Sequence, residues 1–209
     1  EVYLLDTAKV ATYYGTPEDP RFDNEGVHAL HRGLRRTLED YPGAMAVGEI
    51  WVADDERFAR YARPDELHLA FNFRLMDTEW DAAQTRDGIE RSIASLRDVG
   101  APTCWVLSNH DRPRHRSRYG AGPEGERRAR AAALLLLGLP GVAYVYNGEE
   151  LGLPSVVLPD EALQDPVWER TGHRERGRDA ERVPLPWRGD TPPYGFSTGT
   201  ATWLPMPAD

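Results

Sequence analysis

Three segments of the 209-residue sequence follow an apolar run with side chains that can carry chemistry. The first, residues 47–51 (VGEIW), places a carboxylic acid between an apolar run and a tryptophan. Burial beside an indole ring would favour the protonated form of Glu49, the form that a general acid needs for glycoside cleavage. The same residue could instead cap the next helix or pair with an arginine. The residue types leave both possibilities open.

The second segment, residues 108–111 (SNHD), places four polar side chains after another apolar run. Such side chains are costly to bury unless each has a hydrogen-bond partner. The hydroxyls of a sugar could supply partners for Asn109, His110 and Asp111. An ordinary helix cap would use asparagine and aspartate equally well. Adjacent histidine and aspartate also occur in metal-dependent phosphohydrolases, but the other histidines have no ligand spacing, so we assign no metal ligands.

The third segment, residues 141–150 (GVAYVYNGEE), is an apolar run that leads into Glu149 and Glu150. By itself this pattern favours a strand followed by two glutamates that start a helix, where the helix dipole stabilises negative charge.

Apolar periodicity predicts the elements that would position these segments. We expect residues 1–20 to be mostly loop and the chain after residue 151 to be largely irregular, since proline and glycine are dense there. The predicted helices are 27–41, 55–61, 88–99 and 124–137. The predicted strands are 44–51, 68–76, 103–107 and 142–146, the first of them buried. Alternating strands and helices indicate βαβ units and a parallel sheet.

Three of the four predicted strands end in carboxylate, histidine or asparagine side chains. In a (β/α)8 barrel the catalytic residues come from the carboxyl ends of several strands, so this pattern favours a barrel over a doubly wound sheet. Four strands amount to about half of such a barrel.

Composition narrows the class of partner. The formal net charge is −9 and no basic stretch is long enough to track a phosphate backbone, which argues against nucleic acid. The longest apolar run, residues 131–137, is too short to cross a bilayer. The single cysteine, Cys104, excludes an internal disulfide and suits a reducing compartment, so we expect a cytoplasmic protein. Nothing in the sequence indicates an oligomeric state.

In their order and spacing, the three segments resemble glycoside hydrolase family 13, the α-amylase family. Residues 41–43 (YPG), 164–166 (QDP) and 178–187 (RDAERVPLPW) are similar to its α-glucosidase branch, in which an arginine precedes a hydrophobic-Pro-x-x-Trp turn. The resemblance covers roughly residues 22–205. It implies that residues 1–209 are part of a catalytic (β/α)8 barrel, with the four strands as its fifth to eighth. The N-terminal half-barrel and the C-terminal β-domain of the family would then be absent.

The resemblance also implies roles for individual residues. Glu49 matches the general acid/base and Asp111 the carboxylate that stabilises the transition state. His110, Asn109 and Arg182 match positions that bind the sugar. The implied reaction is retaining cleavage of terminal α-linked glucose from a small oligosaccharide or disaccharide, without a cofactor. A transglycosylase or isomerase of the family, such as a trehalose synthase, and a non-catalytic relative are the alternatives.

Two positions depart from the family pattern. The nucleophile is an aspartate in a Gly-Phe-Arg-x-Asp-like segment, and none precedes Glu49; Asp6 lacks the arginine two residues earlier. Glu181 replaces a small residue, often cysteine. The sequence begins without an initiator methionine and ends without an obvious terminal element, so we interpret both ends as cuts within a longer protein. By itself the chain is expected to be inactive and poorly stable, with strands 44–51 and 142–146 as exposed sheet edges.

Overall fold

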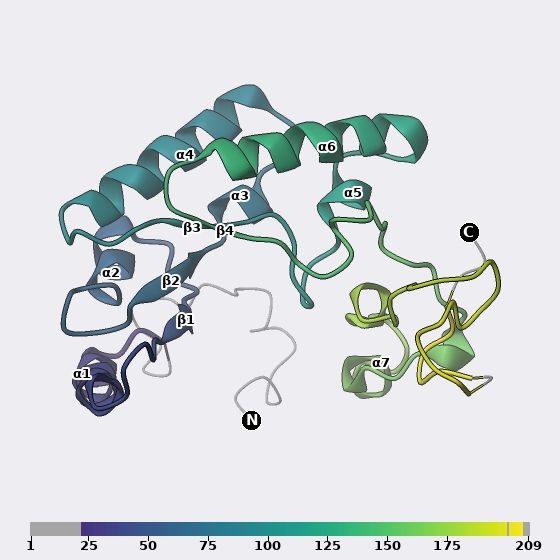
Figure 1. Ribbon diagram of the computed structural model, residues 1–209, viewed down its shortest axis with the longest axis horizontal. Helices are drawn as coiled ribbons and strands as arrows, with labels where there is room; N and C mark the ends of the chain where they lie inside the picture. The colour runs from purple at the N-terminus through teal and green to yellow at the C-terminus, as the bar shows by residue number, and fades with distance from the viewer. Residues whose placement is uncertain (1–21, 200, 207–209) are drawn as a thin grey trace. The chain divides into compact units, whose positions relative to one another are not determined.

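The computed structural model describes residues 22–199 and 201–206, in which helices and short strands alternate along the chain (Figure 1). The loop predicted over residues 1–20, with Asp6, lies outside the described residues. The strands are β1 (Val47–Glu49), β2 (Leu69–Asn72), β3 (Cys104–Val106) and β4 (Val142–Tyr144). The helices are α1 (Glu25–Glu39), α2 (Asp55–Arg60), α3 (Arg74–Asp77), α4 (Ala82–Arg97), α5 (His115–Arg118), α6 (Gly122–Gly138) and α7 (Pro166–Arg170), with the 3-10 helices η2 (Asp160–Ala162) and η3 (Asp179–Glu181).

The four strands form one parallel sheet in the order β1-β2-β3-β4. The register pairs Val47 with Leu69, and Cys104 with both Phe71 and Val142. Each strand lies beside its neighbour in sequence, without the reversal of strand order that a doubly wound sheet shows at its switch point. The predicted parallel α/β sheet is therefore confirmed, and its sequential order is that of a (β/α)8 barrel.

Side-chain caps decide where two of the helices begin. The Oδ1 atoms of Asp54 and Asp81 accept hydrogen bonds from the backbone amides of Arg57 and Gln84, each at 2.8 Å. These bonds satisfy amides that the first turn of a helix leaves without a partner. Because Asp81 caps α4, this helix begins at Ala82, earlier than the predicted helix of residues 88–99.

The predicted strand of residues 68–76 is too long. β2 ends at Asn72, and the chain then turns into α3. The buried Asn72 side chain accepts a hydrogen bond through Oδ1 from the amide of Arg74 at 3.1 Å. This local bond competes with the sheet ladder and starts the turn. The alternation of Leu69, Phe71 and Phe73 in the sequence thus continues past the end of the strand.

β1 and β4 are the edges of the described sheet, as predicted. Val47 of β1 is 36% exposed, whereas the residues of the central strand β3 are at most 3% exposed. The interpretation of residues 44–51 as a buried strand is wrong, because an edge strand has a neighbour on one side only. Inside β3, burial raises the pKa of the Cys104 thiol to about 11, so this thiol stays protonated at neutral pH.

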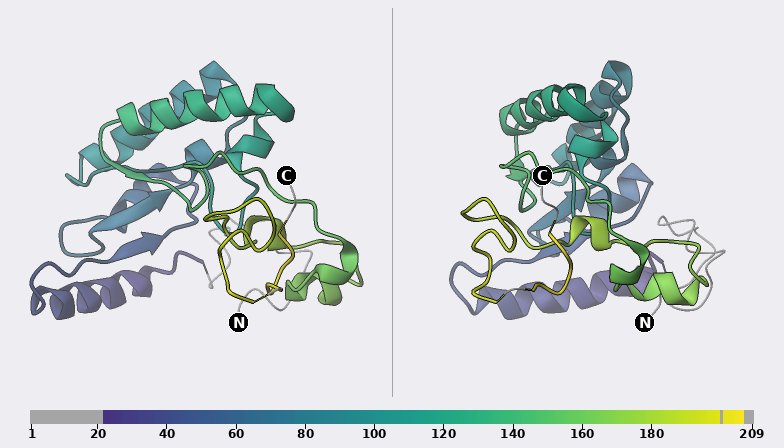
Figure 2. Two further views of the ribbon diagram at one scale, coloured as in Figure 1. Left: turned by 45° about the vertical axis from the view of Figure 1, so that its right-hand side comes forward. Right: turned by 90° about the vertical axis from the view of Figure 1, so that its right-hand side faces the viewer.

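Internal contacts divide the chain into two compact units, Glu1–Val106 with Leu136–Tyr144 and Leu107–Leu135 with Val145–Asp209. The sheet lies in the first unit. There, Phe58 of α2, Ala70 of β2 and Leu96 of α4 form a buried apolar cluster. Figures 1 and 2 show α1 and α4 on either side of the strands β1 and β2. The predicted helices of residues 27–41, 55–61 and 124–137 correspond to α1, α2 and α6.

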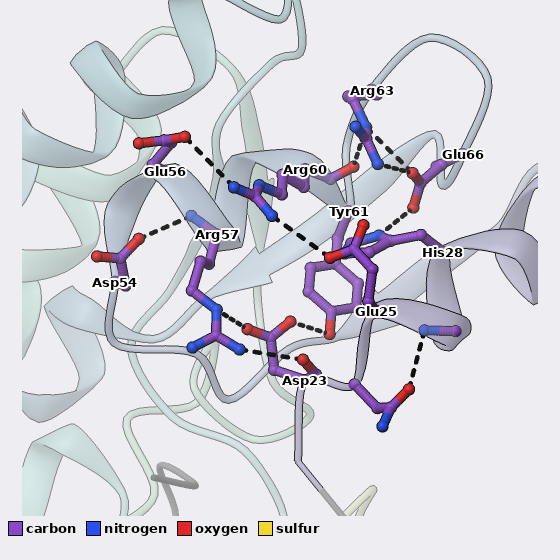
Figure 3. Close-up of polar contacts among 12 residues, drawn as sticks. Asp23, Glu25, His28, Asp54, Glu56, Arg57, Arg60, Tyr61, Arg63 and Glu66 are labelled. Carbon is purple, nitrogen blue, oxygen red and sulfur yellow. Dashed lines mark hydrogen bonds and ion pairs between the residues drawn. The ribbon is translucent and has the colours of Figure 1, made fainter. Parts of the chain in front are cut away.

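A buried ion-pair network holds α1 to the segment between α2 and β2 (Figure 3). Nδ1 of His28 lies 2.8 Å from Oε2 of Glu66, and both side chains are buried. Oε1 of Glu66 accepts hydrogen bonds from Arg32 at 3.2 Å and from Nε of Arg63 at 3.1 Å. Three polar side chains thus compensate for the burial of the Glu66 carboxylate, and Glu66 in turn compensates for the burial of His28.

A second group of polar contacts lies just before α1, where Asp23 stands between Arg57 and Tyr61 (Figure 3). The Tyr61 hydroxyl donates to Oδ1 of Asp23, and the Arg57 guanidinium forms an ion pair with Oδ2. Burial, and then the hydrogen bond to Asp23, raise the pKa of Tyr61. The phenol therefore remains a donor over the whole physiological pH range.

The second unit is mostly irregular after β4, as predicted, and the regular structure among its described residues there is limited to η2, α7 and η3. Leu158, Val183 and Leu204 form its buried apolar cluster. Of the helices in residues 22–199 and 201–206, none is both long and apolar enough to span a bilayer.

Candidate active site

Glu49 is the last residue of β1 and is exposed. Its Oε1 accepts a hydrogen bond from the indole Nε1 of Trp51 at 2.7 Å. The Trp51 ring in turn stacks on Phe73, with 4.1 Å between the ring centroids. The expected burial of Glu49 is not observed, because β1 is an edge strand. The carboxyl group is instead oriented by an anchored indole and open to solvent.

Residues 108–111 form a tight turn after β3. Oδ1 of Asn109 accepts a hydrogen bond from the amide of Asp111 at 2.9 Å, so the asparagine side chain shapes the turn in the manner of a cap. Ser108 is buried, and its Oγ lies 2.9 Å from Nδ1 of His115 while accepting from the His115 amide at 2.9 Å. These bonds fix the backbone that presents His110 and Asp111.

Asp111, His110 and Arg182 come together within the second unit. Nη2 of Arg182 donates to Oδ1 of Asp111 at 2.6 Å, and its Nε donates to the carbonyl oxygen of His110 at 2.9 Å. Nε2 of His110 lies 3.5 Å from the same Oδ1, and the His110 side chain is half exposed. Arg182 thus holds both residues at once, the Asp111 carboxylate through Nη2 and the His110 backbone through Nε. We call this arrangement the Arg182 clamp. Glu49 belongs to the first unit, and its convergence with these three residues stays a prediction.

Arg178 is a partner of Asp111 that the sequence interpretation missed. Its Nη1 donates to Oδ1 of Asp111 at 3.1 Å, and its Nε donates to Oδ2 of Asp165 at 2.6 Å. Burial acts to raise the pKa of Asp165, but hydrogen bonds from Arg178 and from the amide of Val167 outweigh it, so this pKa is lowered. The sequence feature that could have identified Arg178 is its position four residues before Arg182, in a segment that resembles the α-glucosidase branch.

The segment that follows β4 is a turn, not the helix that Glu149 and Glu150 by themselves suggested. Oε2 of Glu149 accepts from the amide of Tyr146 at 3.1 Å, and Oε2 of Glu150 accepts from the amide of Gly148 at 2.7 Å. Oε1 of Glu149 also lies 3.2 Å from Nδ1 of His115. Both carboxylates are therefore engaged in shaping the turn.

Arg114, a second residue that the sequence interpretation missed, is buried and stabilises this turn. Its side chain is 1% exposed, and its Nη1 donates to the carbonyl oxygen of Asn147 at 2.8 Å. The guanidinium carbon also lies 4.7 Å from the centre of the Tyr146 ring. Burial lowers the pKa of Arg114, partly offset by Tyr146 and nearby carboxylates. Aromatic and backbone partners of this kind compensate for a desolvated guanidinium.

Glu181, which replaces a small residue of the family pattern, is 4% exposed. Burial raises the pKa of its carboxyl group, against the opposing hydrogen bond with Ser155 and the charge of Arg114. Its backbone carbonyl accepts from the Tyr146 hydroxyl at 2.9 Å. The larger side chain is thus accommodated by a serine and an arginine that belong to the same unit.

The part of the chain that the structure describes contains no group of three or more histidine, cysteine, aspartate or glutamate side chains placed to hold a metal ion.

A sequential parallel sheet, with a carboxyl group ending one strand and a carboxylate–arginine cluster following another, is typical of enzymes built on a (β/α)8 barrel. The sequence matches the catalytic domain of α-amylase over residues 3–209. The chain therefore belongs to the α-amylase family, as its motifs predicted.

Its relatives include α-glucosidases. The chain is 35% identical to a probable α-glucosidase of Rhizobium meliloti, over 87% of this chain and 33% of that protein. It is 30% identical to an oligo-1,6-glucosidase of Heyndrickxia coagulans, over 85% of this chain and 38% of that protein. The chain thus spans about a third of the length of the relatives it matches.

Solved structures agree with the fold. The α-glucosyl transfer enzyme XgtA matches with a TM-score of 0.79 and 35% identity, over 88% of this chain and 34% of its own. The isomaltulose synthase of Erwinia rhapontici matches with a TM-score of 0.73 over 93% of this chain and 43% of its own, and at 23% identity this likeness concerns the fold alone. The chain is part of a barrel of this family.

Proposed function

We propose that the protein to which this chain belongs is a retaining α-glucosidase that releases terminal α-linked glucose from small oligosaccharides or disaccharides. The observation that carries the proposal is the clamp of Arg182 on Asp111 and His110, in a chain that resembles α-glucosidases over most of its length. Residues 1–209 then form part of the catalytic barrel. We keep the expectation of a cytoplasmic enzyme without a bound cofactor.

In the first step, the carboxyl group of Glu49 donates its proton to the glycosidic oxygen while an aspartate attacks the anomeric carbon. The bond between that carbon and the glycosidic oxygen breaks, and the leaving sugar departs as a neutral alcohol. In the second step, the Glu49 carboxylate takes a proton from water, whose oxygen displaces the aspartate. The indole N–H of Trp51 orients Glu49 for both transfers. The attacking aspartate is the one that the family carries in the motif absent before Glu49.

Asp111 stabilises the positive charge that develops on the sugar ring in both transition states. Its guanidinium partners hold it in one orientation. The half-exposed imidazole of His110 is available to hydrogen-bond hydroxyls of the same sugar, together with Arg182. Asn109 contributes through the turn that presents both residues, and its amide nitrogen is a donor for the sugar.

The alternative is transfer of the glucosyl group to another sugar in place of water. The similarity of the chain to XgtA, an α-glucosyl transfer enzyme, supports this alternative. The two reactions share the covalent intermediate and differ only in the acceptor.

The test uses the full-length protein from the complete coding sequence, supplied with maltose, isomaltose and sucrose. Proton NMR in the first minutes should show α-glucose as the initial product, because double displacement retains the anomeric configuration. Chromatography of the same samples separates hydrolysis from transfer, since transfer yields longer or isomerised sugars. Release of β-glucose, or no consumption of any α-glucoside, would refute the proposal.

A further inference from the structure

One carboxylate oxygen of Asp111 receives two guanidinium groups. Nη1 of Arg178 lies 3.1 Å and Nη2 of Arg182 lies 2.6 Å from Oδ1, and the imidazole Nε2 of His110 lies 3.5 Å from it. All three of these side-chain contacts fall on Oδ1. The second oxygen, Oδ2, is therefore the one that the clamp leaves for a ligand.

A single turn of the chain presents both arginines. Arg178 and Arg182 stand at the two ends of η3, where Arg178 precedes and Arg182 follows the helical residues. Their side chains thereby reach the same carboxylate. Arg182 also binds the backbone of His110 and belongs to the proposed sugar site, whereas Arg178 extends away from Asp111 to Asp165.

The buried carboxylate of Asp165 fixes the side chain of Arg178. The Asp165 side chain is 2% exposed, and it accepts from Nε of Arg178 at 2.6 Å and from the Arg178 amide at 3.0 Å. The amide of Asp165 donates to Oδ2 of the buried Asp179 at 2.8 Å. The hydrogen bond with Asp165 also raises the pKa of Arg178. A guanidinium held along one edge in this way points its remaining N–H groups in a fixed direction.

We propose that Arg178 is a positioning residue for the reaction, which holds the Asp111 carboxylate by Oδ1 so that Oδ2 faces the sugar. The inference rests on the proposed function. A carboxylate with one oxygen anchored by two guanidinium groups is held in a single orientation, so that little reorganisation is needed when charge develops on the ring. A misplacement of about 1 Å can cost about 10²-fold in rate.

The rival explanation is that Arg178 serves only to compensate the burial of Asp165. A buried carboxylate without its cation is strongly destabilising. In that case the loss of Arg178 would lower stability without a specific effect on turnover, and restoring a positive charge near Asp111 would not restore the rate. The two explanations therefore differ in kcat and in chemical rescue.

The experiment compares Arg178→Ala, Arg178→Lys and Arg176→Ala in the full-length enzyme. Arg176 is the matched control, because it is a similarly exposed arginine of the same loop that pairs with Asp160 and contacts no residue of the site. For Arg178→Ala we expect kcat on an aryl α-glucoside to fall about 10²-fold, with KM changed less than about 3-fold. Arg178→Lys should keep an intermediate rate. Arg176→Ala should retain the kcat and KM of the wild type.

Guanidinium chloride at millimolar concentration, far below denaturing levels, should raise the kcat of Arg178→Ala at least several-fold, and an equal concentration of sodium chloride should not. A kcat for Arg178→Ala within about 2-fold of the control, or a loss that neither lysine nor guanidinium restores, overturns the proposal while the wild-type enzyme remains an α-glucosidase. A wild-type enzyme that cleaves no α-glucoside overturns the proposed function, and the role of Arg178 with it.

Discussion

Nη2 of Arg182 lies 2.6 Å from Oδ1 of Asp111, although 71 residues separate them along the chain. The contact is partly shielded from water, with the two side chains 25% and 20% exposed. Ion pairs at fully exposed positions contribute little, but a charge-assisted hydrogen bond in a shielded site also fixes geometry. Because Arg182 donates to the His110 backbone as well, one side chain sets the relation of two proposed site residues.

The first prediction concerns Arg182. In the full-length enzyme, Arg182→Ala should lower kcat/KM for maltose by roughly 10²–10³-fold, since it removes both the proposed sugar contact and the clamp on Asp111. Arg182→Lys should remain well below the wild type, because an ammonium cannot reach Asp111 and the His110 carbonyl in the same fork geometry. Steady-state kinetics measures both. A lysine variant with wild-type kinetics would show that only the charge matters.

The second prediction concerns Glu49. Glu49→Gln should nearly abolish cleavage of maltose, because a sugar alcohol is a poor leaving group without protonation. An aryl glucoside with an acidic phenol should lose much less in the first step, because it needs little proton donation. The comparison of kcat/KM for the two substrates tests this role. Equal losses on both would indicate that Glu49 has a structural role only.

The third prediction concerns Asp111. Asp111→Asn should impair natural and activated glucosides alike, by roughly 10²-fold or more, because positive charge develops on the ring whatever the leaving group. The same kinetic comparison provides the measurement. Near-normal turnover of either substrate would remove Asp111 from the site.

The fourth prediction is a pH dependence of stability that arises from Glu181. Burial raises the pKa of this carboxyl group in the folded state, so folding favours its protonated form. The associated stabilisation is fully present below the unfolded pKa of about 4.3 and is lost as pH rises through the folded pKa. Glu181→Gln cannot ionise, so its Tm relative to the wild type should increase as pH rises from 4 to 8, by about 1–3 °C.

Thermal melts of the full-length protein at several pH values provide the measurement for Glu181. Glu161→Gln, an exposed glutamate of η2 in the same unit, is the control and should show no comparable trend. A difference between Glu181→Gln and the wild type that is constant from pH 4 to 8 would mean that the ionisation of Glu181 is not linked to folding.

The fifth prediction concerns the buried ion-pair network of the first unit. Glu66→Gln keeps the shape of the side chain but leaves His28, Arg32 and Arg63 without their shared carboxylate. Removal of one member of a buried ionic cluster should cost on the order of 3 kcal/mol, measured by chemical denaturation. Glu56→Gln is the matched control, because Glu56 is 86% exposed and its pair with Arg60 should contribute under about 0.5 kcal/mol. Similar losses for both would show that burial adds nothing to the Glu66 network.

Much of the architecture was predictable from local sequence. Apolar periodicity predicted α1, α2, α4 and α6 and the four parallel strands. A helix or strand that buries one face carries apolar side chains at the period of its own geometry, so the pattern is visible in the sequence. The ends of elements were less predictable. Asn72 and Asp81 shift the boundaries of β2 and α4 through single side-chain hydrogen bonds, which periodicity does not reveal.

The sequence by itself determined the family and the candidate residues Glu49, His110 and Asp111, because these follow apolar strands in motifs of fixed order. Only the tertiary structure decided that Arg182 clamps Asp111 and His110, and that Arg178 joins Asp111 to Asp165. It also showed that Glu49 lies exposed on an edge strand. The physical reason is the distance along the chain over which each effect acts. Periodicity and capping depend on residues a few positions apart. An ion pair between distant loops forms only where the folded chain brings the two charges together.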